Sequence, residues 1–165
     1  MYRVAVVTLS DKGARGERDD TSGQTVKEMV EAQGWRVEET RIVSDDLKAI
    51  TGALLGLVQA GMDLILTTGG TGLGPRDNTP EATLSLIERE VPGLAEVMRL
   101  ETFKISPRAV LSRGVAGIRG KTLIVNLPGS PKAVRECLGV ILPVLSHGLA
   151  VLTGRERECG KAEGE

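Results

Sequence analysis

A run of glycines and an acidic side chain are the residues of this chain best suited to act on a phosphorylated ligand. The stretch Leu66–Thr83 reads LTTGGTGLGPRDNTPEAT, in which an apolar run gives way to four glycines and then to Asp77. Glycines allow backbone conformations with positive φ and let bare N–H groups approach an anion closely. A helix-start signal, with Thr79 as the cap and Pro80 as the first helical residue, adds the positive end of a helix dipole. The stretch therefore predicts a site for an anionic ligand, with a carboxylate placed where a metal ion could join it.

The glycine pattern leaves the identity of that ligand open. No Lys-Ser or Lys-Thr pair follows the glycines, as a Walker loop requires, and the spacing is not a clean dinucleotide-binding fingerprint. A tight turn after a strand is the alternative interpretation of the glycines, and a turn or helix cap is the alternative for Asp77. The same alternative applies to Asp45, which stands with Asp46 before a helical pattern, and to Asp20, which could cap the first helix.

The elements that must position these residues alternate between strands and helices. The apolar runs predict strands at Val4–Leu9, Trp35–Val43, Met62–Thr68, Val115–Ile118 and Thr122–Leu127, with the last two joined as a hairpin. Apolar spacing and caps predict helices at about 23–34, 44–61, 79–89 and 94–103, and a closing helix that starts at Pro131. Ser130 would cap the closing helix, and Pro143 would kink or split it. Such alternation predicts an α/β fold in which helices cover both faces of a mostly parallel sheet.

The predicted topology also places the loops. Ligands bind open sheets of this kind at the carboxyl ends of the strands. Three polar loops, residues 10–22, 69–78 and 126–131, should emerge at that edge, and so should the loop that carries Asp45. We therefore expect these loops to converge on one pocket.

The composition narrows the classes of partner. With 165 residues and a net charge of -1, the chain is expected to form one domain without a basic surface for nucleic acid. An aromatic content of 2% argues against a base-stacking surface. The sequence contains no run of about 18 apolar residues, so we expect no membrane span. The two cysteines favour a reduced, cytoplasmic setting over a disulfide framework. Residues 1–154 should form the domain and residues 155–165 a flexible tail.

Several motifs, taken together in their order, resemble the molybdopterin-binding family of molybdenum cofactor biosynthesis. They are TTGGTG…RDNTPEAT, then LSRGVAGIRGKTLIVNLPGSPKAV, with TLSD near the N-terminus and the acidic pair in IVSDD. The similarity runs from about Val4 to Leu152, and stand-alone molybdopterin adenylyltransferases look most similar within the family. The resemblance implies a three-layer α/β/α sandwich, ATP and molybdopterin as substrates, Mg²⁺ as cofactor, and homotrimers that sometimes pair into hexamers.

The resemblance also assigns roles to individual residues. Asp45 and Asp77 match the family's two functional aspartates, which would act in catalysis and hold Mg²⁺. Because Ser44 stands where many relatives have proline, Asp46 is an alternative to Asp45. The residues expected to bind substrate are Ser10, Asp11, Thr68, Gly69, Gly70, Thr71, Gly72, Asn126, Pro128, Gly129 and Ser130. The candidate cations for the phosphates are Lys12, Arg76, Arg113 and Lys132.

The implied reaction suits these residue types. Molybdopterin phosphate would attack the α-phosphate of ATP, and a phosphate monoester is already largely ionised near neutral pH, so no strong base is needed. Positioning and charge neutralisation by a metal, backbone N–H groups and Arg or Lys would do the work. Two alternatives stay open: a non-catalytic molybdopterin-binding paralogue, and hydrolysis of a nucleotide pyrophosphate. Transient contact with molybdopterin synthase or with the molybdate-insertion protein is a further expectation.

Overall fold

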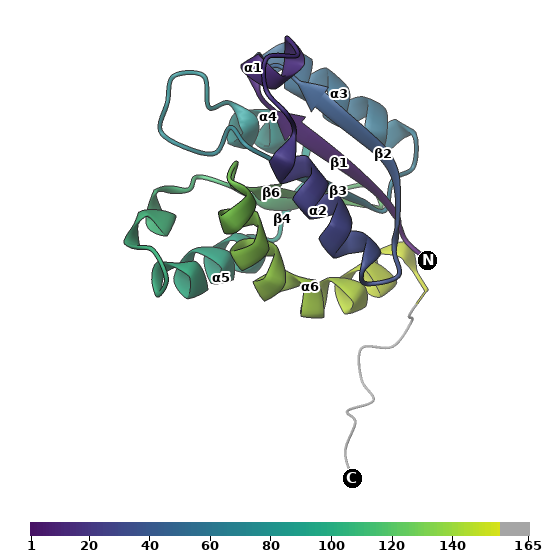
Figure 1. Ribbon diagram of the computed structural model, residues 1–165. Coiled ribbons are helices and arrows are strands. Elements are labelled where there is room, and N and C mark those ends of the chain that lie inside the picture. Colours follow the sequence, from purple (N-terminus) through teal and green to yellow (C-terminus); the bar gives the residue numbers. More distant parts are fainter. Residues whose placement is uncertain (156–165) are drawn as a thin grey trace.

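A six-stranded sheet forms the centre of the protein, seen in a computed structural model that describes residues 1–155 (Figure 1). The strand order is β2-β1-β3-β6-β5-β4. The strands are β1 (Arg3–Leu9), β2 (Arg36–Val43), β3 (Leu64–Thr68), β4 (Arg89–Glu90), β5 (Ala116–Arg119) and β6 (Thr122–Leu127). Strands β2, β1, β3 and β6 run parallel, β5 is antiparallel to β6, and β4 is antiparallel to β5. The predicted mostly parallel sheet and the β5–β6 hairpin are therefore confirmed.

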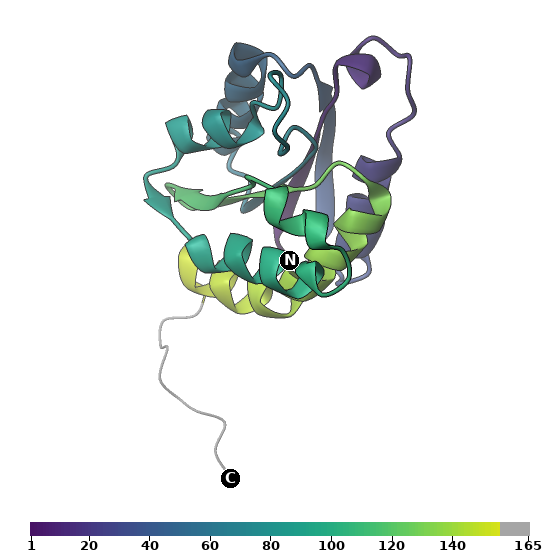
Figure 2. The same ribbon diagram turned by 90° about the vertical axis from the view of Figure 1, so that its left-hand side faces the viewer.

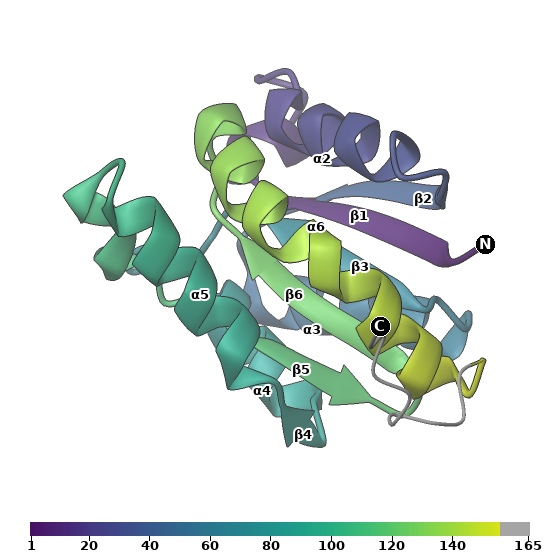
Figure 3. The same cartoon turned by 90° about the horizontal axis from the view of Figure 1, so that it is seen from below.

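Helices cover both faces of the sheet and make three layers, as Figures 2 and 3 show. On one face lie α2 (Thr21–Glu31), α5 (Pro92–Phe103) and α6 (Pro131–Thr153), and on the other lie α3 (Leu47–Gln59) and α4 (Thr79–Leu86). The central strands alternate between two aliphatic cores, because Val4 and Val6 face α2 and α6 whereas Ala5 and Val7 face α3. Burial on both faces explains why these strands are continuous apolar runs in the sequence.

The path of the chain opens a crevice at one edge of the sheet. After β1 the chain passes through a short helix, α1 (Asp11–Ala14), to α2 on one face, whereas after the neighbouring β3 it passes to α4 on the other face. The two loops therefore diverge at the carboxyl ends of adjacent strands. This divergence is the topological switch point at which open α/β sheets bind ligands.

The start of α4 differs from the prediction by one residue. Thr79 is the first residue of the helix, not its cap, and Asn78 stands at the cap position without a side-chain capping bond. The Thr79 hydroxyl donates instead to the carbonyl oxygen of Gly69 at 2.9 Å. A long-range bond to the glycine turn thus replaces the local cap that the sequence pattern favoured.

The end of α4 also comes earlier than predicted. The helix stops at Leu86, and Arg89–Glu90 form the short strand β4 beside β5. The N–H of Glu88 donates to the Ile118 carbonyl oxygen at 2.8 Å. Pairing with the hairpin therefore overrides the helical pattern at residues 87–89.

The closing helix α6 runs without interruption over 23 residues, so of the two effects predicted for Pro143, a kink or a split, the split is wrong. Its predicted cap is confirmed, since the Ser130 hydroxyl accepts a hydrogen bond from the Ala133 N–H at 3.2 Å. By length and composition alone α6 could cross a membrane, a test that core helices of folded domains also pass. Here its apolar stripe packs against the sheet: Val134, Leu138, Ile141, Leu145 and Leu149 are buried.

The two ends of the described chain meet. The Arg155 guanidinium lies 4.7 Å from the centre of the Tyr2 ring, and its Nη1 donates to the Met1 carbonyl oxygen at 3.0 Å. Of the predicted tail, residues 156–165 lie outside the described residues. Arg155 itself contacts Met1 and Tyr2, which precede β1.

Candidate functional site

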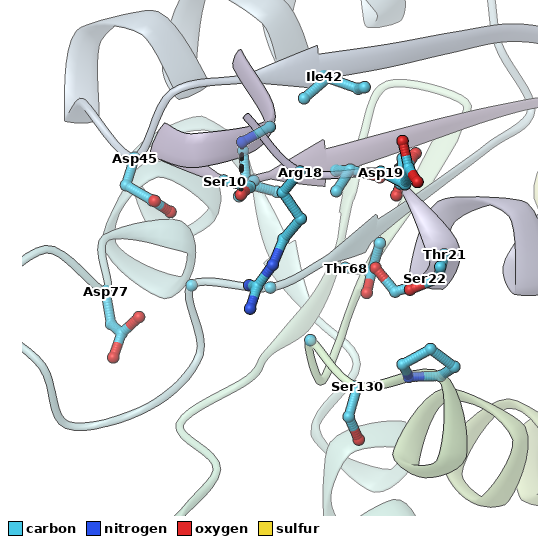
Figure 4. Close-up of a pocket in the computed structure, with 18 residues that line it drawn as sticks. Ser10, Arg18, Asp19, Thr21, Ser22, Ile42, Asp45, Thr68, Asp77 and Ser130 are labelled. Atoms are coloured by element: carbon cyan, nitrogen blue, oxygen red, sulfur yellow. Dashed lines mark hydrogen bonds between the residues drawn. The ribbon is translucent and has the colours of Figure 1, made fainter. Parts of the chain in front are cut away.

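A cavity of about 660 Å³ lies at the carboxyl ends of β1, β3 and β6. The three loops predicted to converge all contribute to its lining, as does the loop after β2 (Figure 4). The expected site residues that line it are Ser10, Asp45, Thr68, Gly69, Gly70, Asp77, Gly129 and Ser130. The convergence prediction is therefore confirmed.

The neighbouring acids Asp45 and Asp46 have different surroundings. The Asp46 carboxylate caps α3 by accepting a hydrogen bond from the Ala49 N–H at 3.0 Å. Asp45 lines the cavity instead, and its carboxylate accepts from the Asp11 N–H at 2.9 Å. The Asn78 side chain donates to the Asp45 carbonyl oxygen at 2.9 Å and holds this turn beside the glycine loop. The ordinary capping role thus belongs to Asp46, and Asp45 is the acid that faces the cavity.

The charge on Asp45 lies in an unfavourable environment. Burial raises the pKa of the Asp45 carboxyl, and the nearby negative charges of Asp11 and Asp77 raise that pKa further. The hydrogen bond from the Asp11 N–H opposes this shift. A cation bound between the Asp45 and Asp77 side chains would relieve the repulsion, because opposite charge favours the ionised form of a carboxyl.

Asp11 is occupied with another partner. Arg76 binds its carboxylate through Nε at 2.6 Å and Nη2 at 2.9 Å, and the Asp45 N–H donates to it at 3.0 Å. The hydrogen bonds from Arg76 lower the pKa of Asp11 to about 2. Asp11 was predicted to bind substrate and Arg76 to bind phosphate. The two side chains instead form an ion pair that supports the turn at Asp45, and neither lines the cavity.

The glycine turn after β3 packs closely against the end of β1. Gly69 and Gly70 have φ angles of 97° and 66°, which side-chain-bearing residues rarely adopt. A Cβ on Gly69 would stand 2.5 Å from the Leu9 carbonyl oxygen. The Asp77 carboxylate, further along the loop, accepts from the Gly74 N–H at 2.8 Å. The turn thus brings bare backbone into the cavity and points Asp77 at the same space.

Arg113 anchors the loop that carries Asp77. Its Nε donates to the Gly72 carbonyl oxygen at 2.8 Å and its Nη2 to the Asp77 carbonyl oxygen at 2.6 Å, and its Nη1 forms an ion pair with Glu81. Its own N–H donates to the Thr71 carbonyl oxygen at 2.8 Å. Arg113, predicted as a phosphate cation, therefore acts as a brace for the loop that carries Asp77.

Asn126 is also committed to the interior. Its side chain is 2% exposed, and Nδ2 donates to the hydroxyls of Thr67 at 3.0 Å and Thr83 at 2.9 Å. Its Oδ1 accepts from the Val115 N–H at 3.2 Å. The structure places Asn126 and Pro128 along a second cavity of about 210 Å³, which residues of α5 and α6 also line. Thr71 and Gly72 lie outside the first cavity as well.

Sequence reasoning missed part of the lining. Of the four predicted cations none reaches the cavity, and Arg18 is the cation that does. Asp19, Asp20, Thr21 and Ser22, at the start of α2, line it too. The Asp20 carboxylate caps α2 through the Gly23 N–H at 2.8 Å and accepts from the Thr8 hydroxyl at 2.9 Å. The sequence could have identified these residues by their location, since all of them belong to the 10–22 loop that was predicted to face the ligand.

Within residues 1–155 no group of three or more His, Cys, Asp or Glu side chains could hold a metal by itself. Mg²⁺ is commonly held by one or two carboxylates together with water and substrate phosphates. The pair Asp45 and Asp77 therefore fits a magnesium ion that arrives with a phosphorylated substrate, not one enclosed by protein ligands.

Comparisons with known proteins identify relatives. The family profile described as "Probable molybdopterin binding domain" matches residues 5–147. The molybdopterin adenylyltransferase of Helicobacter pylori is 38% identical over 154 residues, which cover 92% of this chain and 88% of the relative. The crystal structure of the molybdopterin biosynthesis enzyme MoaB from Thermus thermophilus has a TM-score of 0.88 at 54% identity, with 93% of this chain and 98% of that chain covered. The tungsten cofactor synthesizing protein MoaB from Pyrococcus furiosus has a TM-score of 0.84 at 36% identity, with coverage of 92% and 97%.

Proposed function

We propose the following function for this chain, which belongs to the molybdopterin-binding family of molybdenum cofactor biosynthesis. The function is transfer of an adenylyl group from Mg-ATP to the terminal phosphate of molybdopterin, which yields adenylyl-molybdopterin and pyrophosphate. The observation that carries the proposal is that Asp45 and Asp77 line one cavity together with the glycine turn at Gly69 and Gly70. Relatives named molybdopterin adenylyltransferase, at 38% and 40% identity, support it.

The reaction exchanges one phosphorus–oxygen bond for another. An ionised oxygen of the molybdopterin phosphate attacks the α-phosphorus of ATP, and the bond from that phosphorus to the β-phosphate bridging oxygen breaks. The electron pair leaves with pyrophosphate. Because the nucleophile is already ionised near neutral pH, the absence of histidine from the cavity lining is compatible with this chemistry.

The protein's own contribution is position and electrostatics. The Gly70 N–H and the hydroxyls of Ser22 and Ser130 lie at the cavity and can donate to phosphate oxygens. The Thr68 hydroxyl and the Gly69 N–H instead donate to backbone carbonyl oxygens of the protein. The cavity also carries the carboxylates of Asp45 and Asp77, which would repel a bare polyphosphate. These two side chains would hold Mg²⁺, and the ion would supply charge neutralisation at the phosphates.

Product formation tests the proposal directly. Folded protein is incubated with ATP, MgCl₂ and molybdopterin, and adenylyl-molybdopterin and pyrophosphate are measured. Asp77→Asn should lower kcat by about 10²–10³-fold while the fold is kept, since an asparagine oxygen can still accept from the Gly74 N–H.

Asp46→Asn is the matched control for this variant. It makes the same chemical change at the helix cap next to Asp45, where asparagine is as good a cap as aspartate. Its turnover should equal that of the parent protein. Absence of adenylylated product from the parent protein, or full activity in Asp77→Asn, would overturn the proposed function.

The other outcomes of the assay identify the alternatives. A non-catalytic binding paralogue would take up molybdopterin but show no magnesium-dependent affinity for ATP in calorimetry. A nucleotide pyrophosphatase would release AMP from ATP without any pterin acceptor.

We further propose that the chain works in the cytoplasm as a homotrimer, which can pair into a hexamer, and that it contacts molybdopterin synthase or the molybdate-insertion protein transiently. Exposed apolar side chains on α5 and the following turn support an interface between copies: Leu100, Phe103, Ile105, Val110 and Leu111. Sedimentation at micromolar concentration should show trimers, and monomers alone would contradict the proposal.

A further inference from the structure

Arg18 is the basic residue in the cavity lining, and its guanidinium has no partner among the residues that the structure describes. It lies between α1 and α2, is exposed, and forms no hydrogen bond or ion pair within residues 1–155. In Figure 4 its side chain extends across the cavity, with Asp45 and Asp77 on one side of the guanidinium and Thr68, Ser22 and Ser130 on the other. The guanidinium therefore lies where it would contact phosphates bound in the cavity.

The other cations near the site are bound to other groups or lie outside the cavity. Lys12 belongs to the second kind, since its side chain forms no hydrogen bond or ion pair within residues 1–155 but does not line the cavity. Arg76 binds Asp11, Arg113 binds the glycine loop, and Arg15 binds Glu17 at 2.9 Å. Lys132 lies outside the cavity beside Glu136. Arg18 is thus the cation with five free N–H donors at the position where two anionic substrates must meet.

None of the carboxylates that line the cavity, the adjacent Asp19 included, forms an ion pair with Arg18 within residues 1–155. Asp20 is engaged by the Thr8 hydroxyl and the Gly23 N–H, Asp45 by the Asp11 N–H, and Asp77 by the Gly74 N–H. Ion pairing with the protein therefore does not explain where Arg18 lies.

We propose that Arg18 is a catalytic residue that donates to a phosphate of the bound nucleotide, at the junction between the leaving pyrophosphate and the incoming molybdopterin phosphate. This inference rests on the proposed function. It identifies Arg18 as the protein side chain whose positive charge neutralises the reacting phosphates. A guanidinium suits the role because its planar fork gives two parallel hydrogen bonds to phosphate oxygens, which a lysine cannot reproduce.

Binding and turnover of Arg18→Gln test the proposal separately. Calorimetry measures the affinity for pyrophosphate in excess MgCl₂, and steady-state kinetics measure kcat/KM for ATP with molybdopterin saturating. Arg18→Gln should weaken pyrophosphate binding by about tenfold and lower kcat/KM by about 10–100-fold. Its thermal midpoint should equal that of the parent protein, because no contact within the described chain is lost.

Two further variants sharpen the test. Arg15→Gln makes the same change three residues away in the same loop, at a guanidinium paired with Glu17 outside the cavity, and should leave both measurements unchanged. Arg18→Lys keeps the charge without the fork and should fall between Arg18→Gln and the parent protein. The defect of Arg18→Gln in pyrophosphate binding should shrink as ionic strength rises.

The results separate this proposal from the proposed function. If the parent protein makes no adenylyl-molybdopterin, the proposed function fails, and pyrophosphate binding still decides whether Arg18 holds a phosphate. If the parent protein is active and Arg18→Gln matches it in both measurements, Arg18 has no role and this inference is wrong. An equal defect in Arg15→Gln would also overturn it, because loop charge and not the contact would then be responsible.

Discussion

Asn126→Ala should destabilise the protein while acting little on chemistry, although the family resemblance assigns this residue to substrate binding. Its amide joins β6 to Thr67 on β3, to Thr83 on α4 and to the Val115 N–H. Alanine removes these three hydrogen bonds, each worth about 1 kcal/mol net. Because Thr67 and Thr83 are 0% exposed, water cannot readily reach the hydroxyls that lose their partner. The expected loss in the free energy of unfolding is about 2–4 kcal/mol.

Urea unfolding measures this loss as a lower midpoint at unchanged slope. A loss of about 3 kcal/mol corresponds to a fall of roughly 6–12 °C in the thermal midpoint for a domain of this size. Thr67→Val is the matched control, since it keeps the shape of a fully buried residue and removes only one partner. It should cost about 1 kcal/mol.

Activity measured well below the thermal midpoint completes the test. Turnover per folded molecule should stay close to that of the parent protein, because Asn126 does not line the cavity that contains Asp45 and Asp77. Unchanged stability together with lost activity would refute the reasoning and return Asn126 to the ligand-binding set.

Two further predictions concern the supports of the site. The pKa of Asp11 is lowered to about 2 from an ordinary value of 3.8. Its contribution to stability is therefore fully present above about pH 4 and is lost as pH falls toward 2. Asp11→Asn should flatten the fall of the urea midpoint across this range, and an equal slope in both proteins would contradict the assigned ion pair. Arg113→Lys keeps the charge but cannot bridge the carbonyl oxygens of Gly72 and Asp77. It should lower kcat by about tenfold or more with a small change in thermal midpoint, and unaltered kinetics would show that the loop does not need this brace.

Local patterns in the sequence were sufficient for most of the elements. Continuous apolar runs predicted the central strands because those strands are buried on both faces, and apolar spacing predicted the stripe of α6 with its cap at Ser130. The same patterns failed where a distant partner competed. Thr79 is drawn to Gly69, and residues 88–91 pair with β5, so neither end of α4 follows its local signals.

The sequence by itself determined the strand–helix alternation, the glycine turn and the edge of the sheet where the loops meet, because these depend on periodicity and on backbone freedom close along the chain. Only the tertiary structure decided which polar side chains face the cavity. Asp45 and Asp46 are chemically identical neighbours, and one caps a helix while the other faces the cavity. Likewise Arg18, not Arg76 or Arg113, reaches the cavity, because the latter two are bound by acceptors dozens of residues away. Such choices depend on partners brought together by folding, and no local spacing in the chain encodes them.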